Sequence, residues 1–198
     1  MTSAFFIYVK DPGVAKTVAS IDNNCMEVDK VVFLTNSNTA EAERNIIDSV
    51  FKSCCGENKL EVVAIDNFTI KTIDSFVHIH SDKSSKEELL TFAIKNVDVD
   101  IALTATSSEV FASNYIYKVL NVFNDDSIGV VYTDYFENGV VKHLEYLQPM
   151  ITGKIPIKEF AIRSKLLEKD LSPELFETVI EFFNKSIIKH LPEELYAV

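Results

Sequence analysis

Glycine, proline and cysteine are all scarce in this chain, and each shortage excludes a class of protein. With five glycines and five prolines in 198 residues, the sequence is neither collagen-like nor a flexible linker. Three cysteines, Cys25, Cys54 and Cys55, are too few for a disulfide framework. No apolar run approaches the roughly 18 residues that a membrane-spanning helix needs, so we expect no membrane insertion.

Basic residues are also few relative to acidic ones. Lysine and arginine total 19 against 30 aspartates and glutamates, which gives a formal net charge of −11. Such a charge repels nucleic-acid phosphates and anionic lipids, so general nucleic-acid binding is not expected. The apolar run from Ser3 to Val9 has no basic segment before it, which predicts a strand rather than a signal peptide and hence a cytoplasmic protein. The Ile-, Asn- and Lys-rich composition is typical of AT-rich genomes, so a virus-encoded protein acting in the host cytoplasm is an alternative.

Short apolar runs alternate with helical patterns over the first two thirds of the chain. This alternation predicts an α/β domain, with a mostly parallel, Rossmann-like sheet flanked by helices. Strands are predicted at residues 5–9, 30–34, 60–65, 76–80, 100–104 and 128–132, and helices at 14–24, 39–54, 84–95 and 113–123. A hairpin over Asn138-Gly139 then joins 134–137 to 140–144, because both turn residues tolerate positive φ. Helices at 160–168 and 173–186 and an extended run at 187–190 complete a single domain, 1–198.

Parallel α/β sheets bind ligands at the carboxyl ends of their strands, where loops and helix N-termini meet. Backbone N–H groups and hydroxyls at such an edge suit a phosphate or a sugar. Neither a Gly-rich dinucleotide fingerprint nor a P-loop occurs, which weighs against a dehydrogenase and a P-loop ATPase. The candidate nucleotide- or sugar-binding residues at these strand ends are Tyr8, Lys10, Asp11, Thr35, Asn36, Ser37, Thr104, Thr106 and Glu109.

Two histidines lie two residues apart on a predicted strand. His78 and His80 therefore share one face, with Asp82 close behind. Two imidazoles so placed are compatible with zinc, but no third ligand is evident by spacing. A polar strand surface is the simpler interpretation, and we predict no metal ligands here.

Several segments, in their order along the chain, resemble family 2 glycosyltransferases of the GT-A fold. The run from Ile128 to Asp134, followed by Asn138-Gly139, resembles the family's "vYsD…dG" segment. The run from Ile155 to Arg163 resembles the start of an acceptor-side helix. The run from Ile188 to Tyr196 resembles the closing "hipepLYyyR". The resemblance divides the domain into a nucleotide-binding-like half, 1–127, and an acceptor-side-like half, 128–198.

The resemblance implies a nucleotide-sugar donor bound across the carboxyl edge of the sheet. In the family an Asp-x-Asp motif holds Mn²⁺ or Mg²⁺ on the diphosphate, and a later carboxylate deprotonates the acceptor hydroxyl. Asp134 and Glu174 are the candidates for that catalytic carboxylate. Glu174, Glu177 and Glu181 also fit a solvated acidic helix face.

The sequence departs from the family at the metal-binding motif, which here reads Thr104-Ala105-Thr106. Hydroxyls are poorer ligands than carboxylates for a hard divalent cation. Mn²⁺ or Mg²⁺ is therefore expected only if Glu109 or another acid replaces the lost pair. Lys10 and Arg163 are the basic candidates for a metal-free diphosphate site.

Three functions remain open on the sequence alone. The first is a glycosyltransferase-like protein that transfers a hexose from a nucleotide sugar, although its degenerate motif argues against metal-dependent transfer. The second is a non-catalytic GT-A module that binds a protein partner in an assembly. The third is an unrelated α/β nucleotide-binding protein, which a different sheet order would favour.

Overall fold

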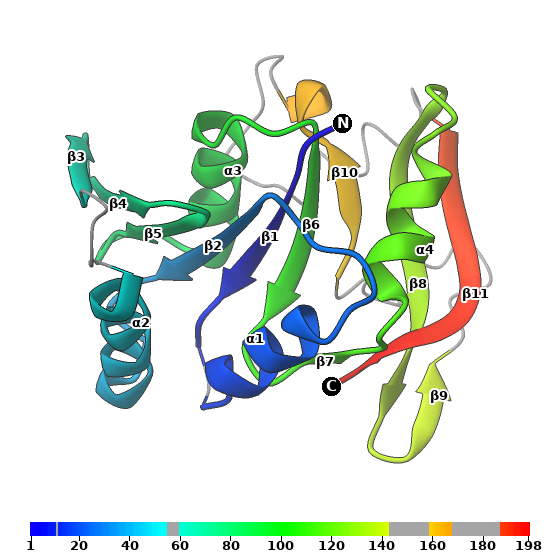
Figure 1. Cartoon of the computed structure of the whole chain (residues 1–198), viewed down its shortest axis with the longest axis horizontal. Coiled ribbons are helices and arrows are strands. Elements are labelled where there is room, and N and C mark those ends of the chain that lie inside the picture. The colour runs from blue at the N-terminus through cyan, green and yellow to red at the C-terminus, as the bar shows by residue number, and fades with distance from the viewer. Residues whose placement is uncertain (11, 55–59, 143–158, 168–186) are drawn as a thin grey trace.

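The computed structural model describes residues 1–10, 12–54, 60–142, 159–167 and 187–198, which form an eleven-stranded mixed sheet with helices on both faces (Figure 1). The strands are β1 (Ser3–Tyr8), β2 (Lys30–Thr35), β3 (Glu61–Ile65), β4 (Phe68–Ile73), β5 (Phe76–His80), β6 (Ile101–Thr106), β7 (Val110–Phe111), β8 (Ile128–Glu137), β9 (Val140–Lys142), β10 (Ala161–Arg163) and β11 (Ile187–Ala197). The helices are α1 (Val14–Asp22), α2 (Glu41–Cys54), α3 (Lys86–Asn96), α4 (Tyr115–Val122) and the 3₁₀ turn η1 (Ser164–Leu167).

The strand order is β3-β4-β5-β2-β1-β6-β10-β8-β11-β7, with β9 paired to β8. Strands β5, β2, β1 and β6 are parallel neighbours in the middle of this order. Strand β10 runs antiparallel to both β6 and β8, so β6 and β8 point the same way. The carboxyl ends of β5, β2, β1, β6 and β8 therefore lie along one edge.

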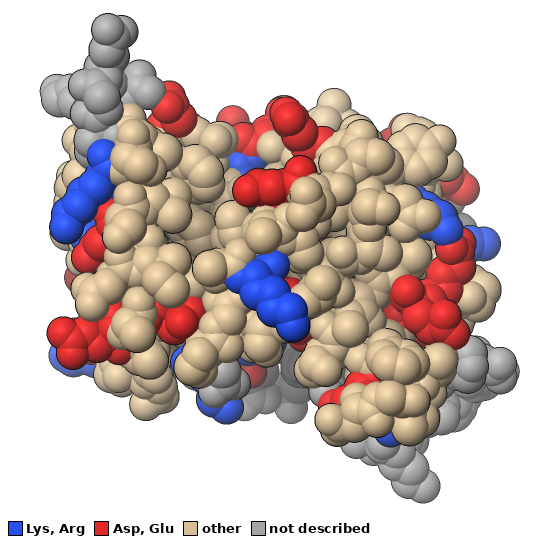
Figure 2. Space-filling view, turned by 60° about the horizontal axis from the view of Figure 1, so that its bottom comes forward, with Lys and Arg blue, Asp and Glu red and all other residues tan. Residues whose placement is uncertain are grey.

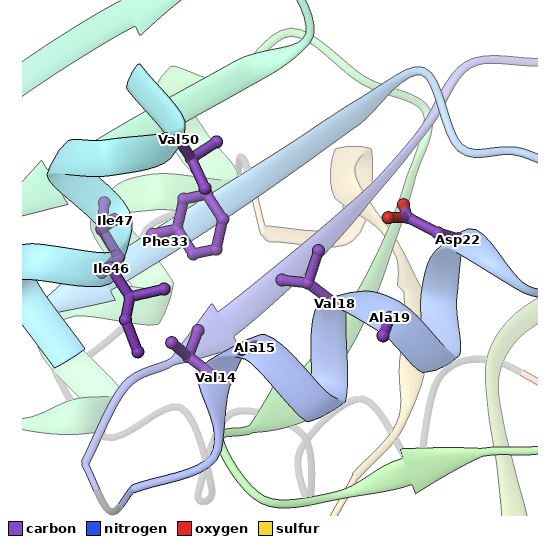
Figure 3. Close-up of a pocket in the computed structure, with 9 residues that line it drawn as sticks. All are labelled: Val14, Ala15, Val18, Ala19, Asp22, Phe33, Ile46, Ile47 and Val50. Carbon is purple, nitrogen blue, oxygen red and sulfur yellow. The ribbon is translucent and has the colours of Figure 1, made fainter. Parts of the chain in front are cut away.

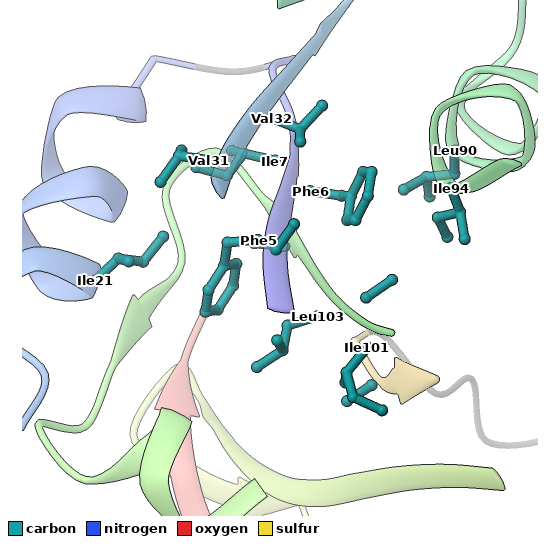
Figure 4. Close-up of a cluster of buried hydrophobic side chains, with 14 of the residues drawn as sticks. Phe5, Phe6, Ile7, Ile21, Val31, Val32, Leu90, Ile94, Ile101 and Leu103 are labelled. Atoms are coloured by element: carbon teal, nitrogen blue, oxygen red, sulfur yellow. The ribbon is translucent and has the colours of Figure 1, made fainter. Parts of the chain in front are cut away.

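Strand β1 lies inside the sheet, between β2 and β6, and every one of its residues is buried. Its alternate side chains pack on opposite faces of the sheet, as the strand pleat requires. Phe5 points to the face that carries Ile21 of α1, and Phe6 points to the face covered by Leu90 and Ile94 of α3 (Figure 4). Such two-sided burial is typical of a strand inside a parallel sheet covered by helices.

The α/β fold class is confirmed, and the structure corrects several details. The sheet is mixed, because a hairpin of β3 and β4 and the inserted β10 bring antiparallel pairs. The helix predicted at 160–168 is wrong, since Ala161–Arg163 is a strand followed by a 3₁₀ turn. Phe160 and the three β10 residues are all buried, and a short apolar run does not distinguish a buried strand from a helix.

Other boundaries shift by small amounts. The capping box of α3 is formed by Ser85 and Glu88, so this helix begins at Lys86 rather than at the predicted residue 84. The hairpin turn is as predicted, with positive φ at Asn138 and Gly139. The extended run after residue 187 continues to Ala197, while the helix predicted at 173–186 lies outside the described residues. No helix in the described segments is both long and apolar enough to cross a membrane.

Candidate functional site at the carboxyl edge of the sheet

The predicted edge residues from β1, β2 and β6 converge in the structure. Tyr8 is level with Thr106 in the β1–β6 register. The Asn36 side-chain amide donates to the Tyr8 hydroxyl at 3.2 Å and to the Ser84 carbonyl at 3.0 Å. A hydrogen-bonded row therefore joins the end of β2 to the end of β1. Figure 2 shows this face of the molecule, where a patch of basic side chains lies near the middle of mostly uncharged surface.

The hydroxyls of Thr104 and Thr106 are both engaged inside the protein. Thr104 is buried, and its hydroxyl donates to the Phe160 carbonyl at 3.1 Å and accepts from the Phe160 N–H at 3.0 Å. The Thr106 hydroxyl donates to Glu159 Oε1 at 2.9 Å and accepts from Lys86 Nζ at 3.0 Å. Thr104 thus ties β6 to the start of β10, and Thr106 alone faces the polar cluster.

Two buried glutamates, Glu109 and Glu159, lie side by side behind Thr106. One oxygen of Glu109 accepts from the Thr106 backbone N–H at 2.8 Å. Burial, and then the charge of Glu159, raise the pKa of Glu109 to about 9. Glu159 Oε2 is buried, and no backbone N–H, amide or hydroxyl among the described residues donates to it. The carboxyl groups of Glu109 and Glu159 are close enough to form a hydrogen bond with each other when one of them is protonated. These observations fit one proton shared by the pair, carried by Glu109 at neutral pH.

Aromatic side chains enclose this acid pair. Tyr115 is buried, and burial together with the charges of Glu159 and Glu109 raises the pKa of its phenol. Tyr196 lies against the same two acids, with its own phenol pKa raised for the same reasons. The surroundings are therefore of low polarity, which favours the protonated carboxyl over the charged one.

Lys86 is the cation of the site. As the first residue of α3, it follows the Ser85 cap, and its ammonium lies 3.5 Å from Glu159 Oε1 and 5.8 Å from the centre of the Tyr8 ring. Its side chain is 30% exposed, whereas that of Glu159 is 1% exposed. The ammonium thus reaches from solvent into the acid pair.

The remaining predicted edge residues play mixed roles. Lys10 is exposed, and its backbone N–H donates to the Ser107 hydroxyl at 3.1 Å, which holds the end of β1 to the loop after β6. Ser37 is exposed, and Asp11 lies outside the described residues. The Asn36 carbonyl accepts from Arg44 at 2.6 Å, so the turn after β2 is fixed by its own hydrogen bonds.

The N-terminus of α1 also opens on this edge, but a carboxylate of the protein already occupies it. Glu43 accepts from the backbone N–H groups of Gly13 at 3.3 Å and Val14 at 2.9 Å. Gly13 has a φ of 137°, and a Cβ there would lie 2.9 Å from Ser108 Cα. A bound phosphate at this helix start would have to displace Glu43.

His78 and His80 are not arranged as a ligand pair. His78 Nε2 and His80 Nδ1 both contact the Thr35 hydroxyl, at 2.8 and 2.9 Å, and His80 Nε2 lies 3.2 Å from Asp82. If the carboxylate fixes the proton on His80 Nε2, Thr35 donates to His80 and accepts from His78. Burial lowers the pKa of His78 to about 4, with the charge of Lys71 as the next cause. Thr35 therefore anchors a neutral histidine between α2 and the sheet.

Asp134, a candidate catalytic carboxylate, lies level with Thr106, because Ala161 of β10 pairs with both Leu103 and Val131. Asp134 is fully buried, and its Oδ1 lies 2.8 Å from His190 Nε2. The His190 ring stacks on Tyr132 at 4.8 Å and is 18% exposed. The exposed member of this Asp–His pair is thus the histidine. Glu174, the other candidate, lies outside the described residues.

Arg163 does not contribute to this site. It pairs with Ile101 at the start of β6, the end opposite to Thr106. Its guanidinium donates to the carbonyls of Phe123 and Ile128, at 2.6 and 2.8 Å. Arg163, one of the two basic candidates for a diphosphate site, is therefore not at this edge, and its guanidinium instead bonds to carbonyls at the end of α4.

Metal coordination fits this site poorly. The described residues contain no group of three His, Cys, Asp or Glu side chains placed to hold a metal ion. Both threonine hydroxyls are engaged, and Glu109 favours its protonated form, which is a weak ligand for Mn²⁺ or Mg²⁺. No step of a reaction is therefore assigned to a metal here.

An apolar groove of about 210 Å³ lies between α1 and α2 (Figure 3). Phe33 of β2 forms its floor, with Val18 and Ile46 on the two helices. Its lining offers one carboxylate, Asp22, and no basic side chain, so the groove does not suit a nucleotide.

Sequence reasoning missed Lys86, Glu159 and His190 as site residues. Lys86 had a signal, since it starts a helix immediately after the loop that follows a strand. His190 lay within the segment that resembles the family's closing motif. Glu159 had none, because its place beside Glu109 depends on β10, which the sequence pattern indicated as a helix.

Neither a protein-family model nor a curated protein sequence matches this chain. Among solved structures, TarS of S. aureus in complex with UDP-GlcNAc has a TM-score of 0.68 at 11% identity, over 100% of this chain and 58% of TarS. The mannosyltransferase PcManGT of Pyrobaculum calidifontis, in complex with GDP-Man and Mn²⁺, has a TM-score of 0.68 at 10% identity, over 99% of this chain and 56% of that one.

A third similar structure is glucosyl-3-phosphoglycerate synthase of Mycobacterium tuberculosis, in complex with Mn²⁺, UDP and phosphoglyceric acid. Its TM-score is 0.63 at 14% identity, over 99% of this chain and 70% of that one. The chain thus spans a little over half the length of TarS and PcManGT. At such low identity the likeness concerns the fold alone, and it confirms that the chain has the GT-A fold of glycosyltransferases.

Proposed function

We propose that this chain binds a nucleotide sugar at the carboxyl edge of its sheet and acts as a glycosyltransferase-like protein that transfers a hexose. The observation that carries the proposal is the convergence of Tyr8, Asn36, Lys86 and Thr106 at that edge. Its support is the GT-A fold, shared with proteins whose structures hold UDP-GlcNAc, GDP-Man or UDP. Lys86 offers one partly exposed ammonium at this edge, which suits a phosphate, whereas Tyr8 and Asn36 are buried and hydrogen-bonded to each other beneath it.

The proton of the acceptor hydroxyl goes, in this proposal, to the Asp134–His190 pair. Asp134 is buried and orients the ring through His190 Nε2, and His190 is the member that contacts solvent. An imidazole held by a carboxylate is a common general base. Glu174 stays a prediction for the same role.

A non-catalytic binding module is the second candidate. It is favoured by the internal use of the edge groups: Thr104 bonds to Phe160, Glu43 caps α1, and Glu109 with Glu159 forms a buried pair. A site whose polar groups satisfy one another has less need of a ligand. In that case a protein partner is the binding target. The cytoplasmic or viral setting also stays a prediction.

A thermal-shift panel tests the proposal. The purified chain is heated with UDP, UDP-GlcNAc, GDP or GDP-Man, each with Mn²⁺ or EDTA, and with uridine or guanosine as phosphate-free controls. A ligand at 100 times its Kd stabilises the folded state by about 2.7 kcal/mol. Stabilisation by nucleotides but not by nucleosides supports the proposal. No shift with any nucleotide contradicts it and leaves the binding module.

A further inference from the structure

We propose that the Lys86 ammonium supplies, within the chain itself, the positive charge that a divalent cation supplies at comparable sites, so that a nucleoside diphosphate binds here without metal. This inference rests on the proposed nucleotide site and adds how that site neutralises the diphosphate.

The first support is the position of the ammonium. Lys86 Nζ lies 3.0 Å from the Thr106 hydroxyl, the last residue of β6 and of the segment that stands in place of the metal-binding motif. An ammonium has three N–H donors, and its contacts with the described residues use two of them, toward Thr106 and Glu159. With 30% of the side chain exposed, a donor is left for a ligand in the solvent.

The second support is the charge of the cluster. If both glutamates were ionised, Glu109, Glu159 and Lys86 would together carry one negative charge and repel a diphosphate. The raised pKa of Glu109 leaves it neutral, so the cluster has no net charge, and the ammonium is offset only by Glu159 at 3.5 Å. Because of the shared proton, the cluster does not repel an anion, although the whole chain carries a net negative charge.

The third support is that several of the neighbouring backbone donors that could bind an anion are already occupied. The first turn of α3 has its Ser85 and Glu88 N–H groups bonded within the capping box, and the start of α1 is capped by Glu43. These backbone donors are therefore not open to a phosphate, and Lys86 is the basic side chain whose contacts with Thr106 and Glu159 hold it at this edge.

Calorimetric titration tests the inference with UDP and GDP as the probes. Wild type is titrated in EDTA and in Mn²⁺, and Lys86→Met and Lys86→Arg are titrated in EDTA. Lys83→Met is the matched control, because Lys83 is an exposed lysine in the same loop, three residues earlier. We expect equal affinity in EDTA and Mn²⁺, a loss of about 10- to 100-fold in Lys86→Met, a smaller loss in Lys86→Arg, and no change in Lys83→Met.

The outcomes separate the two proposals. Binding that requires Mn²⁺, or binding that Lys86→Met leaves intact, overturns the inference and retains the nucleotide site. Absence of binding in both EDTA and Mn²⁺ overturns both. The comparison of EDTA with Mn²⁺ needs only wild type, so it decides the metal question even if Lys86→Met does not fold.

Discussion

Replacing Glu109 by glutamine tests the shared proton directly. In the folded state the pKa of Glu109 is raised to about 9 from 4.5. Between these values the folded chain keeps a proton that the unfolded chain releases. Stability is therefore full below about pH 4.5 and is lost as the pH rises toward 9. At pH 8 this loss is on the order of 3–5 kcal/mol, because one pKa unit corresponds to about 1.4 kcal/mol.

Glutamine reproduces the protonated carboxyl without the titration. Its carbonyl oxygen can accept from the Thr106 N–H, and its NH₂ can donate to Glu159 Oε2. Glu109→Gln should therefore match wild type near pH 5 and exceed it at pH 8 by roughly the amount that wild type loses there. Urea unfolding of both proteins at one-unit intervals from pH 5 to pH 9 measures the difference.

A control separates this effect from the change in net charge. Glu27→Gln removes the same charge from an exposed position, so its stability curve should run parallel to that of wild type. If Glu109→Gln also runs parallel to wild type across pH 5–9, the two glutamates do not share a proton in the folded state. Glu109 would then add a second negative charge beside Lys86, and the cluster would repel a diphosphate.

Three further substitutions test other parts of the site. Since burial lowers the pKa of His78 to about 4, wild type loses about 3 kcal/mol as the pH falls from 6.5 to 4, and His78→Gln should flatten that acid limb of the urea-derived curve. Gly13→Ala places a Cβ 2.9 Å from Ser108 Cα at positive φ and should cost on the order of 1–3 kcal/mol; a urea midpoint equal to wild type would contradict this. Arg163→Met should destabilise the fold by about 2–4 kcal/mol, because it leaves the Phe123 and Ile128 carbonyls without donors. Calorimetry should find the nucleotide affinity of this variant unchanged, and weaker nucleotide binding would place Arg163 in the site.

The central strands could be predicted because their residues carry the signal locally. Phe5 to Ile7 and Val31 to Leu34 are continuous apolar runs, and such runs between helical patterns are typical of buried parallel strands. Strand β10 could not be predicted in the same way. It is only three residues long, and it is a strand because β6 and β8 flank it, which is tertiary information.

For the candidate site too, the sequence predicted local features and missed those that depend on tertiary contacts. The sequence predicted which residues lie at the end of each strand, so it placed Tyr8, Asn36 and Thr106 at one edge of the sheet, as the structure does. It could not predict that Thr104 bonds to Phe160 or that Glu109 meets Glu159, since both contacts join segments far apart in the sequence. Lys86 lies near the start of a predicted helix, and its contacts with Thr106 and Glu159 depend on how α3 is placed relative to β6.

The charges of the Glu109–Glu159 pair are compatible with threonine, rather than a carboxylate, at positions 104 and 106. Carboxylates at positions 104 and 106 would add negative charge next to Glu159, which is already buried 2.9 Å from the Thr106 hydroxyl. With such a group of acids, the chain would need an external cation to stay folded and to bind a phosphate. With hydroxyls at both positions and one proton between the glutamates, a single lysine balances the remaining charge. Hydroxyls at these positions therefore leave no carboxylate pair for a metal, and in the proposed site Lys86 is expected to supply the positive charge that a bound diphosphate needs.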